Sequence, residues 1–84
     1  MTELLDAVAQ VGEDAREQRL LRLAAALYEA QEVAKVRQRD LVARTGLSRE
    51  TIRRHVEDEK IRRHLIPPTP RYLREQERKR RAES

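Results

Sequence analysis

The sequence predicts an all-α chain that forms a small helical bundle and ends in a basic C-terminal tail. Leu, Ala, Arg and Glu dominate the composition, whereas Phe, Trp and Cys are absent, and this balance is typical of helical proteins. Apolar residues recur at the spacing of one helical face in several segments. The 84 residues are enough for one small core and leave little room for a preformed catalytic pocket.

The net charge of +4 is unevenly distributed along the chain. Residues 1–34 hold three arginines against seven acids, a net charge of −4, whereas residues 35–64 carry +5 and residues 65–84 carry +3. A basic surface of this kind either binds a polyanion or is simply solvated. The charge pattern divides the chain into acidic N-terminal helices up to residue 34, a central region at 35–66, and a proline-containing linker with a basic tail at 67–84.

A first helix is predicted to begin at Thr2, whose hydroxyl can cap it. A narrow apolar stripe follows at helical spacing and consists of Leu4, Val8, Val11 and Ala15, with Leu5 alongside. Gly12 interrupts this stripe. It either ends a short helix or lies inside a longer one at a cost of about 1 kcal/mol.

The segment Arg19–Ala30 is the most apolar part of the chain. Its apolar residues cover more than one helical face, which is typical of a central helix in a small bundle. Together with the acidic helices before it, the Leu20–Tyr28 surface is the predicted site of self-association. The next segment, Gln31–Val36, lacks the earlier spacing and is predicted to be the frayed end of this helix and a short connection.

Two helices joined by a tight turn are predicted in the central region. The first is the amphipathic segment Gln38–Arg44, and Gly46 follows where a helix end needs a positive φ angle. Ser48 is a good N-cap, so the second helix is predicted to start at Arg49. Further along, this helix contains two acid–arginine pairs at i,i+4 spacing, Asp58–Arg62 and Glu59–Arg63.

Three prolines stop the second helix and impose an extended stretch. This stretch, Pro67–Pro70, acts either as a semi-rigid spacer or as a strap packed over the core. The highly charged segment Arg71–Ser84 is predicted to be disordered, or only weakly helical, when the chain is free.

The run Asp40-Leu-Val-Ala-Arg-Thr-Gly-Leu-Ser-Arg-Glu-Thr-Ile-Arg-Arg resembles the helix-turn-helix family of bacterial and phage DNA-binding proteins. The resemblance covers about twenty residues, from Gln38 to Glu57. It implies buried positions for four apolar residues, Leu41, Val42, Leu47 and Ile52. Val42 departs from the family, which more often has alanine at that position. Either His55 or Val56 closes the core on the next turn.

The resemblance also implies that the outer face of the second helix reads DNA bases, through Arg49, Glu50, Arg53 and Arg54. An arginine can grip O6 and N7 of guanine with two hydrogen bonds. Glu50 either accepts a hydrogen bond from the amino group of cytosine or holds a neighbouring arginine in place. Phosphate contacts are predicted for polar residues near the two helix N-termini and the turn, namely Gln38, Thr45, Ser48 and Thr51.

The basic tail has two interpretations. It either contacts the DNA backbone or minor groove and raises affinity, or it is a solubilising tail. The shared positive charge of the tail and the central region favours the first. That interpretation assigns further phosphate contacts to Arg71, Arg78, Lys79, Arg80 and Arg81.

We therefore expect a protein that binds double-stranded DNA in a sequence-specific manner, as a small transcriptional regulator associated with the nucleoid in the cytoplasm. One such module reads few base pairs, so a homodimer formed through the N-terminal helices is expected. The alternatives are a phage or plasmid accessory protein that bends or coats DNA, and a helical adaptor that docks a protein partner.

Other function classes find no support in the sequence. There is no Gly-rich phosphate loop and no nucleophile with a base at a recognisable spacing, so no enzymatic activity is predicted. His55 and His64 would lie on nearly opposite sides of one helix without any cysteine, so neither a metal nor a cofactor is predicted. The longest apolar run, Leu23–Tyr28, is too short to cross a membrane.

Overall fold

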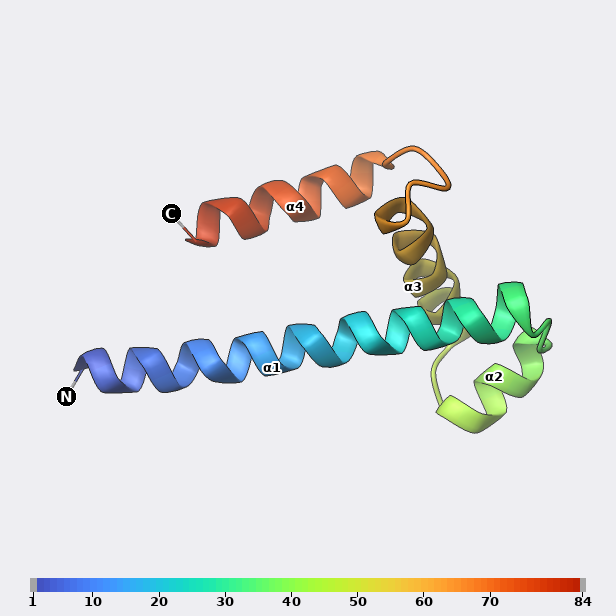
Figure 1. Ribbon diagram of the computed structural model, residues 1–84, viewed down its shortest axis with the longest axis horizontal. Coiled ribbons are helices and arrows are strands. Elements are labelled where there is room, and N and C mark those ends of the chain that lie inside the picture. Colours follow the sequence, from blue (N-terminus) through green and yellow to red (C-terminus); the bar gives the residue numbers. More distant parts are fainter. Residues whose placement is uncertain (1, 84) are drawn as a thin grey trace.

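The computed structural model describes residues 2–83, and these form helices with no β-strand among them. The order of elements is α1 (Thr2–Tyr28), the π-helical turn η1 (Glu29–Val33), α2 (Gln38–Thr45), α3 (Arg49–Arg62) and α4 (Pro70–Glu83). Figure 1 shows α1 as a long rod that α3 crosses near its C-terminal end, while α4 runs back towards the N-terminus. The predicted all-α class is confirmed.

The segment from Thr2 to Tyr28 is one continuous helix. Gly12 lies inside α1, so of the two alternatives for this residue the longer helix is the one that forms. Thr2 already belongs to α1, although the sequence predicted it as the cap. The predicted frayed end is instead the ordered turn η1, in which the Ala34 amide donates to the Glu29 carbonyl at 2.9 Å. Lys35, with φ of 59°, then ends the helical path.

The core forms where α1, α2 and α3 meet. It consists of Leu27 from α1, Leu41 from α2, and Ile52 and Val56 from α3. Partly buried residues pack around this cluster: Leu23, Tyr28, Ala30, Val42 and Leu47. Val56 is buried whereas His55 is half-buried, so the valine closes the core on this turn of α3. This arrangement agrees with the i,i+4 spacing of Ile52 and Val56 on one helical face.

The prediction that residues 71–84 are disordered or weakly helical is wrong for the part that the structure describes, because α4 covers it up to Glu83. Pro70 begins α4, a position where proline is favoured because the first helical amide has no partner. The Thr69 hydroxyl accepts a hydrogen bond from the Tyr72 amide at 3.2 Å. Local signals therefore start this helix, and contacts with α3 hold it.

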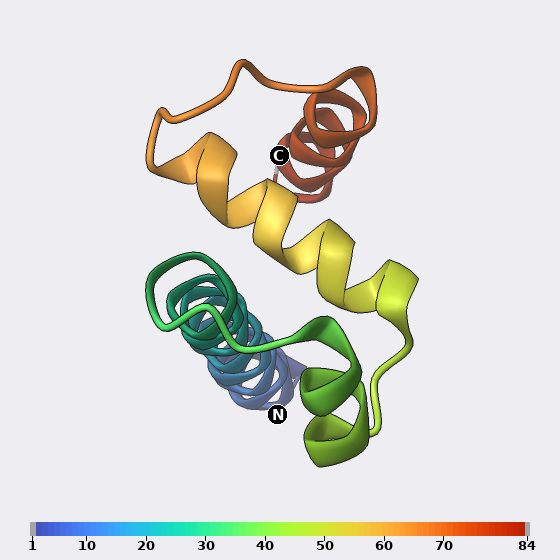
Figure 2. The same ribbon diagram turned by 90° about the vertical axis from the view of Figure 1, so that its right-hand side faces the viewer.

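Arg71 fastens the first turn of α4 to α3. Its guanidinium donates to Asp58 at 2.6 Å and to Glu57 at 3.2 Å on α3, and to Glu75 at 3.1 Å on α4. The hydrogen bond to Asp58 is the main reason that the pKa of Arg71 lies above its ordinary value. Figure 2 shows the result: α3 lies between α1 and α2 on one side and α4 on the other.

Replacing Arg71 with glutamine is expected to loosen α4 from α3, because three carboxylates lose their shared cation. Hydrogen exchange should accelerate in the amides of α4 and leave those of α2 unchanged. Arg74→Gln is the matched control, since Arg74 is exposed one turn further along α4. Equal exchange in the two variants would contradict the fastening role of Arg71.

Candidate nucleic-acid interface

The turn between α2 and α3 has the conformation that the sequence predicts. Gly46 has φ of 73°, and its amide donates to the Val42 carbonyl at 2.9 Å. The Thr45 hydroxyl donates to the Leu41 carbonyl at 2.6 Å and accepts from the Leu47 amide at 3.1 Å. A residue with a side chain at position 46 would meet no neighbouring atom, so the requirement for glycine comes from the backbone conformation alone.

Ser48 caps α3 as predicted. Its hydroxyl oxygen accepts from the Thr51 amide at 3.1 Å, and its hydroxyl donates to the Thr51 hydroxyl at 2.8 Å. The hydroxyls of Thr45, Ser48 and Thr51 therefore already form hydrogen bonds within the turn and the cap of α3. A phosphate bound here would share these groups with the cap.

Ser48→Ala is expected to destabilise the protein by about 1 kcal/mol, because the α3 amide that the hydroxyl satisfies loses its partner. Urea denaturation followed by circular dichroism measures this change. Ser48→Asp keeps an N-cap acceptor and should retain most of the stability. If the alanine variant unfolds at the same urea concentration as the parent protein, Ser48 does not act as a cap.

The four predicted base-contacting residues lie on the first half of α3. The residues Arg49, Glu50, Arg53 and Arg54 are all exposed. The opposite side of the same helix is anchored by Ile52, which is 0% exposed. Because the core holds this helix segment, its arginines project from a fixed support.

Arg53 is held in place by two carboxylates. It donates to both Glu50 oxygens, through Nη2 at 2.6 Å and Nε at 3.2 Å, and its Nη1 lies 3.8 Å from Glu57. The hydrogen bonding from Arg53 to Glu50, together with the positive charge of Arg53, lowers the pKa of Glu50 below its ordinary value. In the free protein Glu50 thus has the second of the two roles predicted for it, holding a neighbouring arginine.

The second half of α3, together with Arg63 directly after it, is occupied by contacts within the protein. Lys60 lies 2.6 Å from Glu32 of η1, and Arg63 lies 4.2 Å above the ring of Tyr28. Burial alone would raise the pKa of Glu59, but hydrogen bonds from Arg63 and Arg62 outweigh it and lower the pKa. The Glu59–Arg63 pair was predicted and is present at 2.8 Å.

The Asp58–Arg62 pair is not formed, because each residue has another partner. Asp58 binds Arg71, whereas Arg62 binds Glu59 at 3.1 Å. The sequence gives no local signal for the Asp58–Arg71 contact, since the two residues are thirteen positions apart with the proline stretch between them.

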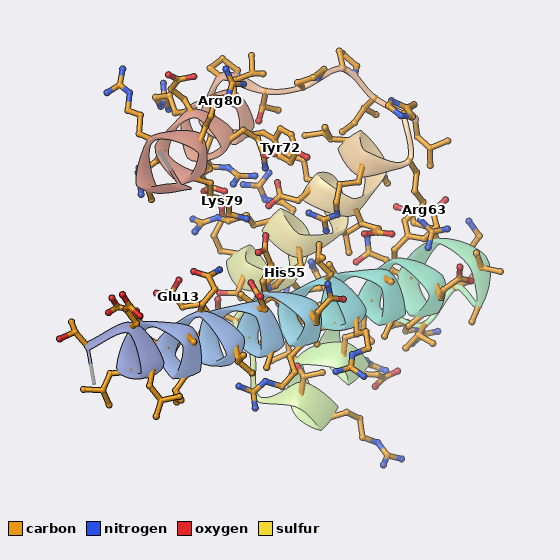
Figure 3. The ribbon with its side chains drawn as sticks, turned by 60° about the vertical axis from the view of Figure 1, so that its left-hand side comes forward. Glu13, His55, Arg63, Tyr72, Lys79 and Arg80 are labelled. Atoms are coloured by element: carbon orange, nitrogen blue, oxygen red, sulfur yellow. The ribbon has the colours of Figure 1, made fainter. Side chains whose placement is uncertain are left out.

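Three basic residues of α4, namely Lys79, Arg80 and Arg81, are paired with carboxylates of α1 or α4. Lys79 lies between α4 and α1 (Figure 3) and donates to Glu17 at 3.1 Å. Arg80 and Arg81 both pair with Glu77, at 3.6 and 3.4 Å. Arg78 is exposed on the same helix, and Gln38 is half-buried at the start of α2. Of the predicted phosphate contacts, Arg71 is the one whose guanidinium is taken up by three carboxylates.

Comparison with known protein families, curated proteins and solved structures finds no match to this chain. Within residues 2–83, no group of three or more His, Cys, Asp or Glu side chains is arranged to hold a metal ion. No helix in the same range is both long and apolar enough to cross a membrane.

Proposed function

We propose that the protein binds double-stranded DNA in a sequence-specific manner, with α2 and α3 acting as a helix-turn-helix. The observation that carries this proposal is the group of three exposed arginines on the first half of α3. One of them, Arg53, is oriented by Glu50. Arginines aimed from the start of a firmly anchored helix are suited to the guanine edge in the major groove.

In the proposed complex, the first half of α3 enters the major groove and α2 lies across the backbone. Arg49, Arg53 and Arg54 reach base edges, and the N-termini of α2 and α3 face phosphates. Because Arg71 of α4 binds Glu57 and Asp58, the readable part of α3 ends near Arg54. A single copy then reads few base pairs, as expected for a small regulator that acts with a second module.

Selection of bound fragments from a random pool of double-stranded DNA tests the proposal. We expect a short enriched motif, and fluorescence anisotropy should show tighter binding to the selected duplex than to a scrambled one. Binding to both duplexes should weaken steeply as salt increases, because phosphate contacts release counterions.

The other outcomes separate the alternatives. Equal, salt-sensitive binding to all duplexes would overturn sequence specificity and favour an accessory protein that coats or bends DNA. Absence of salt-sensitive DNA binding would overturn the whole proposal and leave the adaptor that docks a protein partner.

A further inference from the structure

The N-terminal half of α1 carries an apolar face that nothing else in the described chain covers. Its members are spaced four, three and four residues apart, with one further leucine beside them: Leu4, Val8, Val11, Ala15 and Leu5. The large side chains among them are 63–68% exposed. This spacing is the heptad pattern in which two helices pair along a seam.

This face differs from the one that joins α1 to the rest of the protein. Ala24 and Leu27, from the predicted self-association surface, are buried on the core side of α1. Further towards the N-terminus, the side that faces α4 is polar, with Glu13 directed towards α4 (Figure 3) and Glu17 bonded to Lys79. At 100° per residue, Glu13 lies almost opposite the seam, so α4 leaves the seam free.

We propose that this seam pairs with the same seam of a second copy, with the two α1 helices parallel. The heptad register follows from the apolar residues: Val8 and Ala15 take the a positions, and Leu4 and Val11 take the d positions. Asp14 is then at g. Arg19 is at the following e position. In a parallel pair these two positions meet across the interface, so Asp14 of each copy faces Arg19 of the other.

Charge complementarity distinguishes this arrangement from an antiparallel one. In an antiparallel pair with Val8 against Val11 of the second copy, g positions flank g positions, so Asp14 falls beside Ala7 and loses the arginine. The apolar seam ends after Ala15, because Gln18 and Arg22 continue the same line of the helix and are polar. Two heptads therefore pair, and the chains separate before the core that α1 forms with α2 and α3.

The seam is short, so the dimer is expected to be weak. Interfaces below about 1,200 Å² are typical of transient complexes. The parallel arrangement places both α3 helices at the same end of the dimer. If the proposed DNA binding holds, this places two reading helices side by side. The pairing itself does not rest on DNA binding and is measured without DNA.

Sedimentation equilibrium of the full chain, without DNA, tests the pairing. The average mass should rise from monomer towards dimer between about 10 μM and 1 mM. Val8→Glu should remain a monomer throughout, because two carboxylates would face each other in the seam. Ala9→Glu adds the same charge one residue later, away from the seam, and should dimerise like the parent. A monomeric parent protein at 1 mM would overturn the proposal.

Cysteine cross-linking tests the direction of the pair, and the natural chain has no cysteine to interfere. Val8→Cys should form an intermolecular disulfide on mild oxidation, because each a residue meets its own counterpart in a parallel pair. Ala9→Cys is the control and should cross-link more slowly. Preferential cross-linking between Val8→Cys and Val11→Cys in a mixture would overturn the parallel arrangement. Neither result depends on whether the protein binds DNA, so failure of one proposal is distinguishable from failure of the other.

Discussion

Ile52→Ala is expected to leave much of the protein unfolded at 25 °C. Ile52 is 0% exposed and belongs to the cluster that joins α1, α2 and α3. Truncating a buried isoleucine to alanine costs about 2–5 kcal/mol, and the core of a chain only slightly shorter than this one rarely supplies more than about 3–5 kcal/mol. The loss is therefore comparable with the whole free energy of unfolding.

Thermal and urea denaturation followed by circular dichroism measure this effect. Ile52→Val removes one methylene group and should cost about 1 kcal/mol. Leu73→Ala provides a second control, because Leu73 is 55% exposed on α4 and should change the stability little. An alanine variant at position 52 that unfolds with the same midpoint as the parent would show that stability resides elsewhere.

Arg53→Ala is expected to remove most of the preference for the selected DNA sequence. A bidentate arginine–guanine contact discriminates against the wrong base by about tenfold or more. Anisotropy on selected and scrambled duplexes should therefore show a large loss on the first and a small loss on the second. Because Arg53 is exposed, its loss should leave the melting temperature nearly unchanged.

Arg78→Ala supplies the comparison within the same chain. Arg78 is exposed on α4, and its loss should weaken binding to both duplexes alike if α4 contacts phosphates. If Arg53→Ala and Arg78→Ala reduce binding to both duplexes by the same factor, then Arg53 does not read bases.

The helix boundaries around the tight turn could be predicted because their signals are local. Gly46 needs a positive φ angle, and Ser48 satisfies an amide three residues away. Ile52 and Val56 mark one face of α3 within a single turn. The predictions at Gly46 and Ser48 need only a few neighbouring residues, and the structure agrees with both. The choice between His55 and Val56 stayed open in the sequence, and the structure buries Val56.

The arrangement of α4 could not be predicted in the same way. Its attachment depends on Arg71 meeting Asp58 across the proline stretch, and a charged segment gives no periodic sign of such a partner. The composition of residues 71–84 alone is typical of disorder. Similarly, the sequence does not decide between the two roles predicted for Glu50, because its geometry relative to Arg53 depends on side-chain rotamers.

The position of Glu57 between two arginines couples the exposed face of α3 to the attachment of α4. Its carboxylate lies 3.8 Å from Arg53 and 3.2 Å from Arg71, so the two cations share one counter-ion. If Arg53 moves to a base, Glu57 interacts with Arg71 alone, and the attachment of α4 changes in strength. Thermodynamic linkage makes this effect reciprocal. The factor by which a ligand of Arg53 changes the equilibrium between attached and released α4 is also the factor by which release of α4 changes the affinity for that ligand.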